Sequence, residues 1–276
     1  MLAIFPVFGY TENENRKEVN SMIRFILVWP VAAVYFILSL PFLPIILLLR
    51  KKFPQTVLWL QKVVQLTLKA ICKVAGCRIK VIGLDNIPDD RAVLFTSNHL
   101  SVFDILIQYS QMKRRAVFVA KKNLEWIPFL SWSMKVLRCP FLDRENLRKG
   151  VATIKECADM IKDEDISVFI YPEGTRNKTG DPLKMNPFHD GSFQPAKMTK
   201  CPIIPVCIMN TDAIFEQHKY RVTSEPVIVE YGKPIYWDDL SKEDRKHIGK
   251  YVENVIREMI IRNQDLLEEM KEKKTA

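Results

Sequence analysis

The feature that most limits how this chain can fold is a run of 25 residues without a charge, from Phe25 to Leu49. As a single α-helix this run would be about 37 Å long, which is enough to cross a hydrocarbon core of about 30 Å. Pro30, Pro41 and Pro44 interrupt it, and the last two are expected to bend or break the helix because proline removes a backbone donor. A tilted span and a re-entrant hairpin are therefore both open interpretations.

Basic residues flank this run on both sides, with Arg16, Lys17 and Arg24 before it and Arg50, Lys51, Lys52, Lys62 and Lys69 after it. By the positive-inside rule they place the following domain in the cytoplasm, and a monotopic arrangement gives the same side. A cleaved signal peptide is not expected, because the run is too long and lacks a small-residue cleavage site. We therefore expect a protein of the cell membrane whose functional site lies on the cytoplasmic side.

The stretch from Gln55 to Ala75 alternates apolar and polar residues at helical spacing. Lys62, Lys69 and Lys73 share one face of this helix, and the apolar residues fall on the rest of it. Such a helix either lies in the membrane interface or packs on the protein core with its lysines in water. The adjacent apolar run favours the interfacial helix.

Length and composition narrow the remaining possibilities. With 276 residues the chain can form one large core with an addition, and 48% hydrophobic and 26% charged residues exclude a mainly disordered protein. The net charge of +9 indicates an anionic partner, which could be nucleic acid, an anionic bilayer, a phosphorylated substrate or an acidic carrier protein. Six cysteines without a CxxC pair or a histidine at zinc spacing predict reduced thiols and no metal site.

After Gly76 short β-rich runs alternate with helical ones, which predicts an α/β domain. The expected strands are 78–82, 92–96, 116–120, 166–171, 203–208 and 226–230, and the expected helices are 102–111, 147–162 and a long one from Ser241. The predicted organisation is a tail (1–24), a membrane-associated helical region (25–75), the α/β core (76–240), and a C-terminal helix with a solvated tail from Lys271 (241–276).

The first motif lies between Ala92 and Asp104, where the pattern predicts a strand, a short loop, and a helix that begins near Ser101. Ser101 and Asp104 fit a capping box, so Asp104 could serve only to stabilise the helix start. Alternatively, Asp104 orients His99, because an imidazole is a good general base near neutral pH and a carboxylate on its second ring nitrogen fixes the tautomer. Residues five apart on one helix point about 140° apart, so this pair requires His99 to precede the helix, as the cap indicates.

The second motif runs from Ile166 to Arg176 and predicts a buried strand that ends in a turn, where Gly174 permits unusual backbone angles. In α/β folds, sites lie beyond the ends of the strands. Arg176 offers a planar fork suited to a phosphate, and Thr175 with nearby backbone amides adds donors. The alternative is a plain turn in which Glu173 and Arg176 form a surface ion pair.

Together the two motifs resemble the lysophospholipid acyltransferase family, in particular its bacterial 1-acylglycerol-3-phosphate acyltransferases. Asn98 to Asp104 is similar to the family's histidine and aspartate motif, and Tyr171 to Arg176 to its Phe-Pro-Glu-Gly-Thr-Arg motif. Similar blocks occur in the family's order at Phe118 to Lys121, Pro140 to Arg144, Pro187 to Gly191 and Ile204 to Val206. The resemblance implies a mixed sheet flanked by helices, with an N-terminal membrane-associated helical segment.

The resemblance also implies a reaction, in which a fatty acyl group passes to the sn-2 hydroxyl of 1-acyl-sn-glycerol-3-phosphate and gives phosphatidic acid. The acyl donor would be acyl-CoA or acyl-carrier protein, and no further cofactor is expected. The expected partners are lysophosphatidic acid in the membrane, the anionic bilayer surface and the acyl donor. Nucleic acid is not expected, because no recognition helix, zinc module or aromatic and basic strand pattern occurs.

The resemblance assigns roles to individual residues. His99 would be the general base and Asp104 its partner, and the substrate-binding residues would be Lys121, Arg144, Glu173, Gly174, Thr175 and Arg176. The three basic side chains of this set would hold the phosphate. The chain departs from the family pattern at Tyr171 (usually Phe), Asn177 (usually Ser) and His189 (usually Lys). His189 lacks a fixed charge and is expected at the edge of the site, not as a second catalyst.

Three other functions were weighed. A lipid hydrolase is disfavoured, because the sequence has no Gly-x-Ser-x-Gly elbow and Ser101 fits a helix cap better. A related acyltransferase with another lyso-lipid acceptor fits the same motifs. A non-enzymatic membrane lipid-binding protein would be expected to have lost His99 or Asp104, and both are present.

Overall fold

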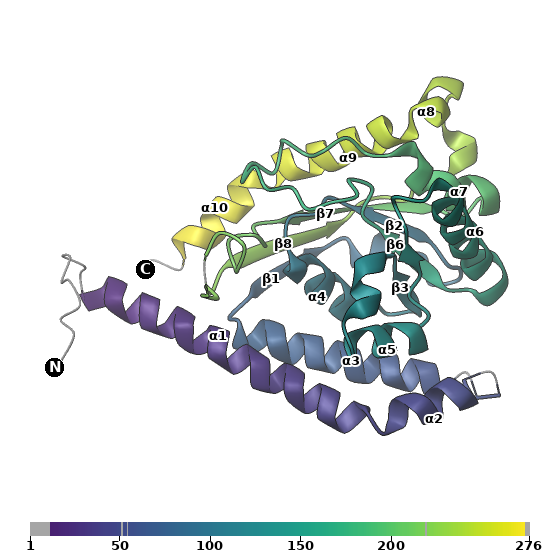
Figure 1. The fold of residues 1–276 in the computed structure, drawn as a ribbon. Helices are drawn as coiled ribbons and strands as arrows, with labels where there is room; N and C mark the ends of the chain where they lie inside the picture. The colour runs from purple at the N-terminus through teal and green to yellow at the C-terminus, as the bar shows by residue number, and fades with distance from the viewer. Residues whose placement is uncertain (1–11, 51, 54, 219, 274–276) are drawn as a thin grey trace.

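The computed structural model describes residues 12–50, 52–53, 55–218 and 220–273. Its centre is a six-stranded sheet with the order β1-β8-β7-β2-β6-β3 (Figure 1). The strands are β1 (Arg78–Ile82), β2 (Leu94–Ser97), β3 (Ala116–Phe118), β6 (Ser167–Ile170), β7 (Ile203–Met209) and β8 (Pro226–Tyr231). Neighbours are parallel except β7 and β8, which are antiparallel. The mixed sheet flanked by helices is therefore confirmed.

A small second sheet forms beside the first. The expected strand 116–120 is interrupted at Val119, so β3 ends at Phe118 and a separate strand, β4 (Ala120–Lys121), turns away. It pairs in parallel with β5 (Phe141–Leu142), a strand that the sequence pattern does not predict because it is only two residues long. This pairing brings the segment of Lys121 next to the segment that leads to Arg144.

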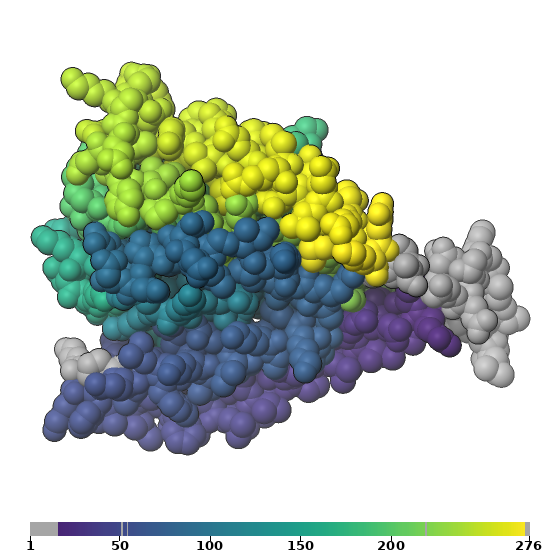
Figure 2. All heavy atoms as spheres, turned by 180° about the vertical axis from the view of Figure 1, so that it is seen from behind, coloured from purple at the N-terminus to yellow at the C-terminus, as the bar shows by residue number. Residues whose placement is uncertain are grey.

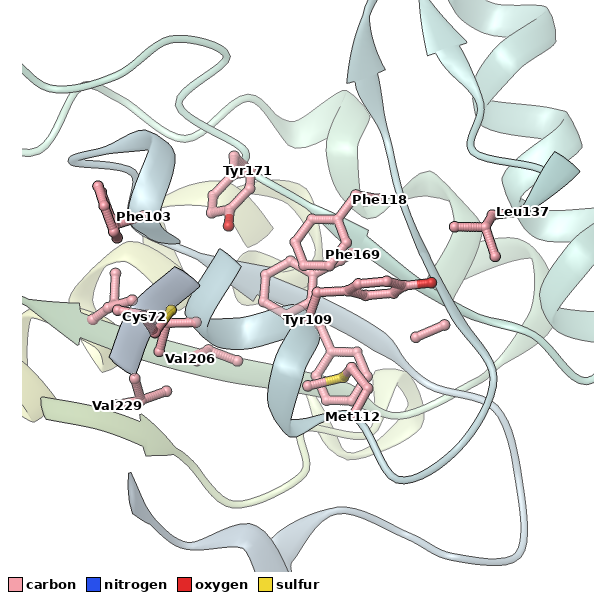
Figure 3. Close-up of a cluster of buried hydrophobic side chains, with 14 of the residues drawn as sticks. Cys72, Phe103, Tyr109, Met112, Phe118, Leu137, Phe169, Tyr171, Val206 and Val229 are labelled. Carbon is pink, nitrogen blue, oxygen red and sulfur yellow. The ribbon is translucent and has the colours of Figure 1, made fainter. Parts of the chain in front are cut away.

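Helices cover both faces of the main sheet. On one face lie α3 (Gln55–Val74) and α4 (Val102–Gln111), and on the other α6 (Leu147–Glu164), α7 (Gln194–Thr199) and α9 (Ile248–Arg262). Each face of the sheet has its own apolar core, the first beneath α3 and α4 and the second beneath α6, α7 and α9. Successive strand residues belong to alternate cores, for example Phe95 to the first and Leu94 to the second. Figure 3 shows part of the first core, where Phe118 and Phe169 stack with ring centroids 4.4 Å apart. Burial on both faces explains the nearly continuous apolar runs of these strands.

Short helices complete the fold: α5 (Leu130–Val136), η1 (Leu84–Asn86), η2 (Lys122–Trp126), η3 (Asp190–Phe193) and η4 (Trp237–Asp239). The predicted long C-terminal helix is wrong, because the segment forms three helices, α8 (Lys242–Lys246), α9 and α10 (Gln264–Glu272). His247, between α8 and α9, has non-helical backbone angles, and α9 ends at Arg262, one residue before Asn263. Residues of α9, such as Val252 and Ile256, are fully buried against the sheet. The C-terminal segment thus belongs to the core layer. Helix α10 includes Lys271, and residues 274–276 of the expected tail lie outside the described residues.

The apolar run forms two helices, α1 (Glu12–Ser39) and α2 (Phe42–Leu49), so the break predicted near Pro41 is confirmed. Pro30 lies inside α1. Because α1 begins at Glu12, residues 12–24 are helical and not a tail, while residues 1–11 and Lys51 lie outside the described residues. Within α1, the segment Arg16–Ser39 has 24 residues, contains an 18-residue window with a mean hydropathy of 2.0, and is long enough to cross a membrane.

The predicted interfacial role of the stretch 55–75 needs correction. Helix α3 buries Val57, Leu60 and Cys72 in the first core, so most of its apolar side chains pack on protein. Three large apolar residues, Leu58, Trp59 and Leu66, remain exposed. Figure 2 shows α1, α2 and α3, in purple to blue, together along one edge of the molecule. The alternative interpretation, an amphipathic helix on the core, therefore holds for α3.

Candidate functional site

The loop between β2 and α4 carries the first motif and is fixed to the neighbouring strand by Asn98. The fully buried side-chain amide of Asn98 donates to the Ile208 carbonyl oxygen (2.8 Å), and its oxygen accepts from the Ile208 backbone N–H (2.9 Å). Such a two-point bond to β7 sets the direction in which the chain leaves the sheet. His99 follows immediately, in the loop and ahead of α4, as the cap predicts.

Asp104 and His99 are in direct contact. Nδ1 of His99 lies 2.7 Å from Oδ2 of Asp104, which is fully buried, while the His99 side chain is 14% exposed. The same oxygen accepts from the N–H groups of Leu100 (2.6 Å) and Ser101 (2.9 Å), and Oδ1 accepts from the hydroxyl of Thr211. Asp104 therefore serves both as the cap of α4 and as the partner of His99, so the two interpretations of this residue are compatible.

The hydrogen bonds around Asp104 also settle which nitrogen of His99 carries a proton. The carboxylate is surrounded by donors, so we assign the proton of the imidazole to Nδ1, which donates to Asp104. Nε2 of the neutral ring then keeps its lone pair. An imidazole held in this tautomer by a buried carboxylate has the arrangement of a general base.

Tyr171 fixes the plane of the imidazole. Its ring stacks on that of His99 with centroids 4.1 Å apart and an angle of 19° between the planes. Its hydroxyl donates to Gln108, whose side chain in turn donates to Ser97 (2.8 Å). Burial raises the pKa of the Tyr171 phenol well above its ordinary value, so it stays a neutral donor. The departure from the family's phenylalanine thus adds a bond inside the aromatic cluster of Figure 3.

Glu173 joins the two motifs. It is 3% exposed, Oε1 accepts from the backbone N–H of His99 (2.7 Å), and Oε2 accepts from the backbone (2.8 Å) and side chain (3.1 Å) of Asn186. Burial raises the pKa of this carboxyl, although these bonds act in the opposite direction. The carboxylate is occupied by protein donors, which differs both from the substrate-binding role that the resemblance implies and from a surface ion pair with Arg176.

Replacing Glu173 by alanine is expected to destabilise the protein, because three donors at His99 and Asn186 lose their acceptor. Bonds to a charged acceptor are worth most, so the free energy of unfolding should fall by about 2–4 kcal/mol. Urea unfolding followed by circular dichroism measures this change. The matched control is Glu156→Ala on the exposed side of α6, expected to change stability by less than about 0.5 kcal/mol. Equal stability of both variants would contradict the bracing role of Glu173.

Two more predicted residues meet beyond the end of β6. Gly174 has φ = 73°, and a Cβ atom there would lie 3.5 Å from Nη1 of Arg144 and 3.6 Å from Cδ2 of His189. His189 is therefore at the edge of the site, as expected. Arg144 is exposed, and among the described residues its guanidinium has no hydrogen-bond or ion-pair partner. Partial desolvation lowers the pKa of Arg144, which remains a cation that no carboxylate neutralises and so suits a phosphate.

The remaining predicted residues lie nearby. Thr175 is exposed on the same loop, and Arg176, with a 40% exposed side chain, donates to Glu216 (3.0 Å). Lys121 is exposed on β4, where it pairs with Leu142. The structure therefore brings His99, Asp104, Glu173, Gly174 and Arg144 together, places Thr175 and Arg176 on the same loop, and sets Lys121 on the adjoining small sheet.

Sequence reasoning missed Thr211, Glu216 and Asn186. Thr211 is the second residue after the end of β7, next to β2 in the sheet, so the rule that sites lie beyond strand ends could have found it. No local pattern marks Glu216 or Asn186, because their partners are distant in the sequence. Among the residues that the structure describes, no group of three or more His, Cys, Asp or Glu could hold a metal ion.

Known proteins are similar to this chain in sequence and in fold. Residues 78–209 match the family model described as Acyltransferase. The 1-acyl-sn-glycerol-3-phosphate acyltransferase of Saccharomyces cerevisiae is 32% identical over 67% of this chain and 59% of its own length. The Cocos nucifera protein of the same name is 32% identical over 59% of this chain and 51% of its own. The human alpha form is 28% identical over 66% and 63%, respectively. The chain thus spans less than two thirds of each relative.

A solved structure has the same fold. The crystal structure of the 1-acyl-sn-glycerophosphate acyltransferase PlsC from Thermotoga maritima aligns with a TM-score of 0.74 over 90% of this chain and 98% of that one. At 23% identity this match concerns the fold, and the sequence matches concern the family. With the motifs, the sheet and these relatives in agreement, residues 78–209 of this chain form a domain of the acyltransferase family.

Proposed function

We propose that this chain transfers a fatty acyl group from an acyl thioester to the sn-2 hydroxyl of 1-acyl-sn-glycerol-3-phosphate, giving phosphatidic acid in phospholipid biosynthesis. The observation that carries the proposal is the contact of 2.7 Å between Nδ1 of His99 and the buried carboxylate of Asp104. The names of the relatives support the acceptor. Acyl-CoA and acyl-carrier protein are the two proposed donors, with no other cofactor.

In the proposed reaction, Nε2 of His99 takes the proton of the acceptor hydroxyl as its oxygen attacks the thioester carbonyl carbon. The new C–O bond forms, the C–S bond breaks, and the leaving thiolate receives the proton back from His99. Asp104 stabilises the imidazolium that exists between these two proton transfers. No covalent acyl-enzyme is needed, because the acceptor is itself the nucleophile.

The cations beside the dyad are proposed to hold the acceptor phosphate. Arg144 lies next to the backbone of Gly174 and has no protein partner among the described residues, and Arg176 has a 40% exposed side chain on the same loop. Lys121 would add a third charge from β4. Planar guanidinium groups bind phosphate oxygens in pairs, which orients the acceptor as well as attracting it.

Loss of one of these cations should weaken binding of the acceptor more than binding of the donor. For Arg176→Ala, kcat/KM for lysophosphatidic acid is expected to fall by about 10- to 100-fold, which corresponds to the free energy of one charge-assisted hydrogen bond. The acyl donor KM should stay nearly constant. Lys178→Ala, an exposed cation two residues away, is the matched control. Unchanged acceptor KM and kcat/KM in Arg176→Ala would contradict the proposed phosphate contact.

We also propose that the protein attaches to the cell membrane with its site on the cytoplasmic side. Large apolar side chains are exposed along α1, α2 and the α5 region, among them Ile26, Trp29, Ile37, Leu48, Trp126 and Trp132. Toward its N-terminus α1 is held to the core by an ion pair of Glu18 with Arg221, and toward its C-terminus by a hydrogen bond from Tyr35 to Ser133. A helix tied to the domain at both ends favours monotopic attachment over a crossing, with the anionic bilayer surface as a partner.

A panel of substrates tests the proposed function. Purified protein in anionic vesicles would receive lysophosphatidic acid or another lyso-lipid, each with acyl-CoA or acyl-carrier protein, and products would be separated by mass spectrometry. We expect phosphatidic acid as the main product with at least one donor. Preferential acylation of another lyso-lipid would identify a related acyltransferase, and binding without turnover would identify a lipid-binding protein.

A further inference from the structure

We propose that Glu216 is a positioning residue that holds Arg176 against the first turn of α4, next to the dyad of His99 and Asp104. This inference rests on the proposed function, because it concerns how the acceptor phosphate is held at a fixed distance from the general base. Glu216 lies in the loop between β7 and β8, and neither of the two family motifs includes it.

The carboxylate of Glu216 accepts three hydrogen bonds. Oε1 accepts from Nη1 of Arg176 (3.0 Å) and from the backbone N–H of Val102 (2.8 Å), and Oε2 accepts from the hydroxyl of Ser101 (2.5 Å). Its side chain is 21% exposed. Ser101 and Val102 are the second and third residues after His99, so one carboxylate connects the proposed phosphate cation to the segment that carries the base.

The start of α4 explains why a carboxylate is held there. Asp104 accepts the N–H groups of Leu100 and Ser101, and the Ser101 hydroxyl accepts that of Phe103. Within this first turn the N–H of Val102 is satisfied by Glu216. A negative charge is also favoured at the N-terminus of a helix by the helix dipole. Glu216 is therefore fixed more firmly than a partner in an isolated surface ion pair.

Arg176 keeps donors for a ligand while it is held. Among the described residues only its Nη1 atom has a hydrogen-bond partner, so Nε and Nη2 remain open. A free arginine side chain loses much rotamer freedom when it binds a phosphate, and one that is already held loses less. The contact with Glu216 therefore orders Arg176 before the acceptor arrives.

The loop that presents Glu216 is itself fixed on two sides. Thr211 donates to Asp104, and Phe215 stacks on Phe25 of α1 with ring centroids 6.2 Å apart and planes at 9°. The backbone N–H of Val222 donates to the carbonyl of Ser21 (3.1 Å). Glu216 thus lies between the dyad and the apolar helix α1, where an acceptor delivered from the membrane would meet Arg176.

A competing role for Glu216 predicts the opposite sign. If its carboxylate merely occupied the position of the acceptor phosphate, removing the charge would strengthen acceptor binding. In that case both Glu216→Ala and Glu216→Gln would lower the acceptor KM. If Glu216 positions Arg176, alanine raises the acceptor KM, and glutamine, whose amide oxygen can still accept from Arg176, restores part of the loss.

Steady-state kinetics of the full chain in anionic vesicles separate these roles. We expect Glu216→Ala to raise the KM for lysophosphatidic acid by about 3- to 10-fold, the effect of ordering one long side chain. Glu216→Gln should fall between Glu216→Ala and the unmodified protein, and the KM for the acyl donor should stay constant. In an Arg176→Ala background, Glu216→Ala should add less than about twofold, because both changes act on one contact. Asp238→Ala, which breaks an exposed ion pair with Lys200, is the control.

Three outcomes would overturn the proposal: an acceptor KM that falls in both Glu216 variants, one that changes in neither, or independent effects of Glu216→Ala and Arg176→Ala. Thermal unfolding of each variant checks that the fold is intact, and Glu216→Gln keeps the test valid if the alanine variant does not fold. If the unmodified protein forms no phosphatidic acid, the proposed function itself fails. Normal turnover with unaltered Glu216 variants rejects only the positioning role.

Discussion

The His99→Ala protein is expected to fold normally and to lose nearly all acyl transfer. The imidazole belongs to neither apolar core, because its contacts are the ring of Tyr171 and the carboxylate of Asp104. The backbone N–H of His99 that donates to Glu173 remains in the variant. Loss of a general base typically lowers the rate by about 10²- to 10⁴-fold, so kcat should fall within that range. Initial rates of phosphatidic acid formation measure the loss, and circular dichroism with thermal unfolding measures the fold.

The matched control for this variant is His218→Ala. His218 lies in the same loop as Glu216, and its Nε2 atom lies 3.1 Å from the backbone carbonyl oxygen of Ala213. This variant should keep most of its activity. A His99→Ala enzyme with full activity would refute the general-base mechanism, and a His99→Ala protein that does not fold would assign His99 a structural role instead.

Asp104→Asn is expected to give the second largest loss. The shape of the side chain is conserved, but the amide carries no charge to stabilise the imidazolium of His99. One orientation of the amide also presents an N–H to Nδ1 and favours the wrong tautomer. In a serine protease triad the same change lowers kcat by about 10⁴-fold, and we expect a loss of about 10²- to 10⁴-fold here.

The same variant separates the two roles of Asp104. If Asp104 served only in the capping box of α4, Asp104→Asn would retain most of its activity, because the amide oxygen of asparagine can still accept from the backbone N–H of Ser101. Thr211→Val is the graded comparison, since it removes the hydrogen bond to Oδ1 and leaves His99 bonded to Oδ2. It should lose far less activity than Asp104→Asn. Equal losses in both variants would indicate general damage to the site.

Local sequence patterns predict most of the strands of this protein correctly. The expected strand 78–82 has the bounds of β1, and 203–208 and 226–230 each differ from β7 and β8 by one residue. β7 and β8 are buried on both faces, so they appear as nearly continuous apolar runs between turn residues. β5 has two residues and depends on pairing with β4, and no local pattern encodes such a pairing.

Errors arose where tertiary contacts override a periodic pattern. The apolar spacing of the C-terminal segment predicts one long helix, yet the helix is interrupted at His247 and at Asn263. Asn263 is nearly buried and donates to Glu230 and to the Met259 carbonyl, contacts that become visible only in the folded chain. For α3, the sequence pattern cannot distinguish a lipid surface from a protein surface as the partner of an apolar face.

In the functional site, too, local patterns predict some contacts, and those that depend on the tertiary structure are missed. The cap at Ser101 made a pairing of His99 with Asp104 feasible, because a capping box has a defined geometry that places His99 outside the helix, and the resemblance to the family then assigned the pair. The partner of Arg176 could not be predicted, since Glu173 lies three residues away in the sequence and Glu216 lies 40 away. In the folded chain, the carboxylate of Glu173 is buried and bonded to backbone donors, whereas that of Glu216 is partly exposed and pairs with Arg176.

One measurement tests the central proposal most directly. The unmodified protein and His99→Ala, in the same anionic vesicles, would be given lysophosphatidic acid and a labelled acyl thioester, and the label in phosphatidic acid would be followed over time. We predict steady transfer of the label to phosphatidic acid by the unmodified protein and a rate at least about 100-fold lower for His99→Ala. Equal rates for the two proteins, or label released only as free fatty acid, would contradict the proposal.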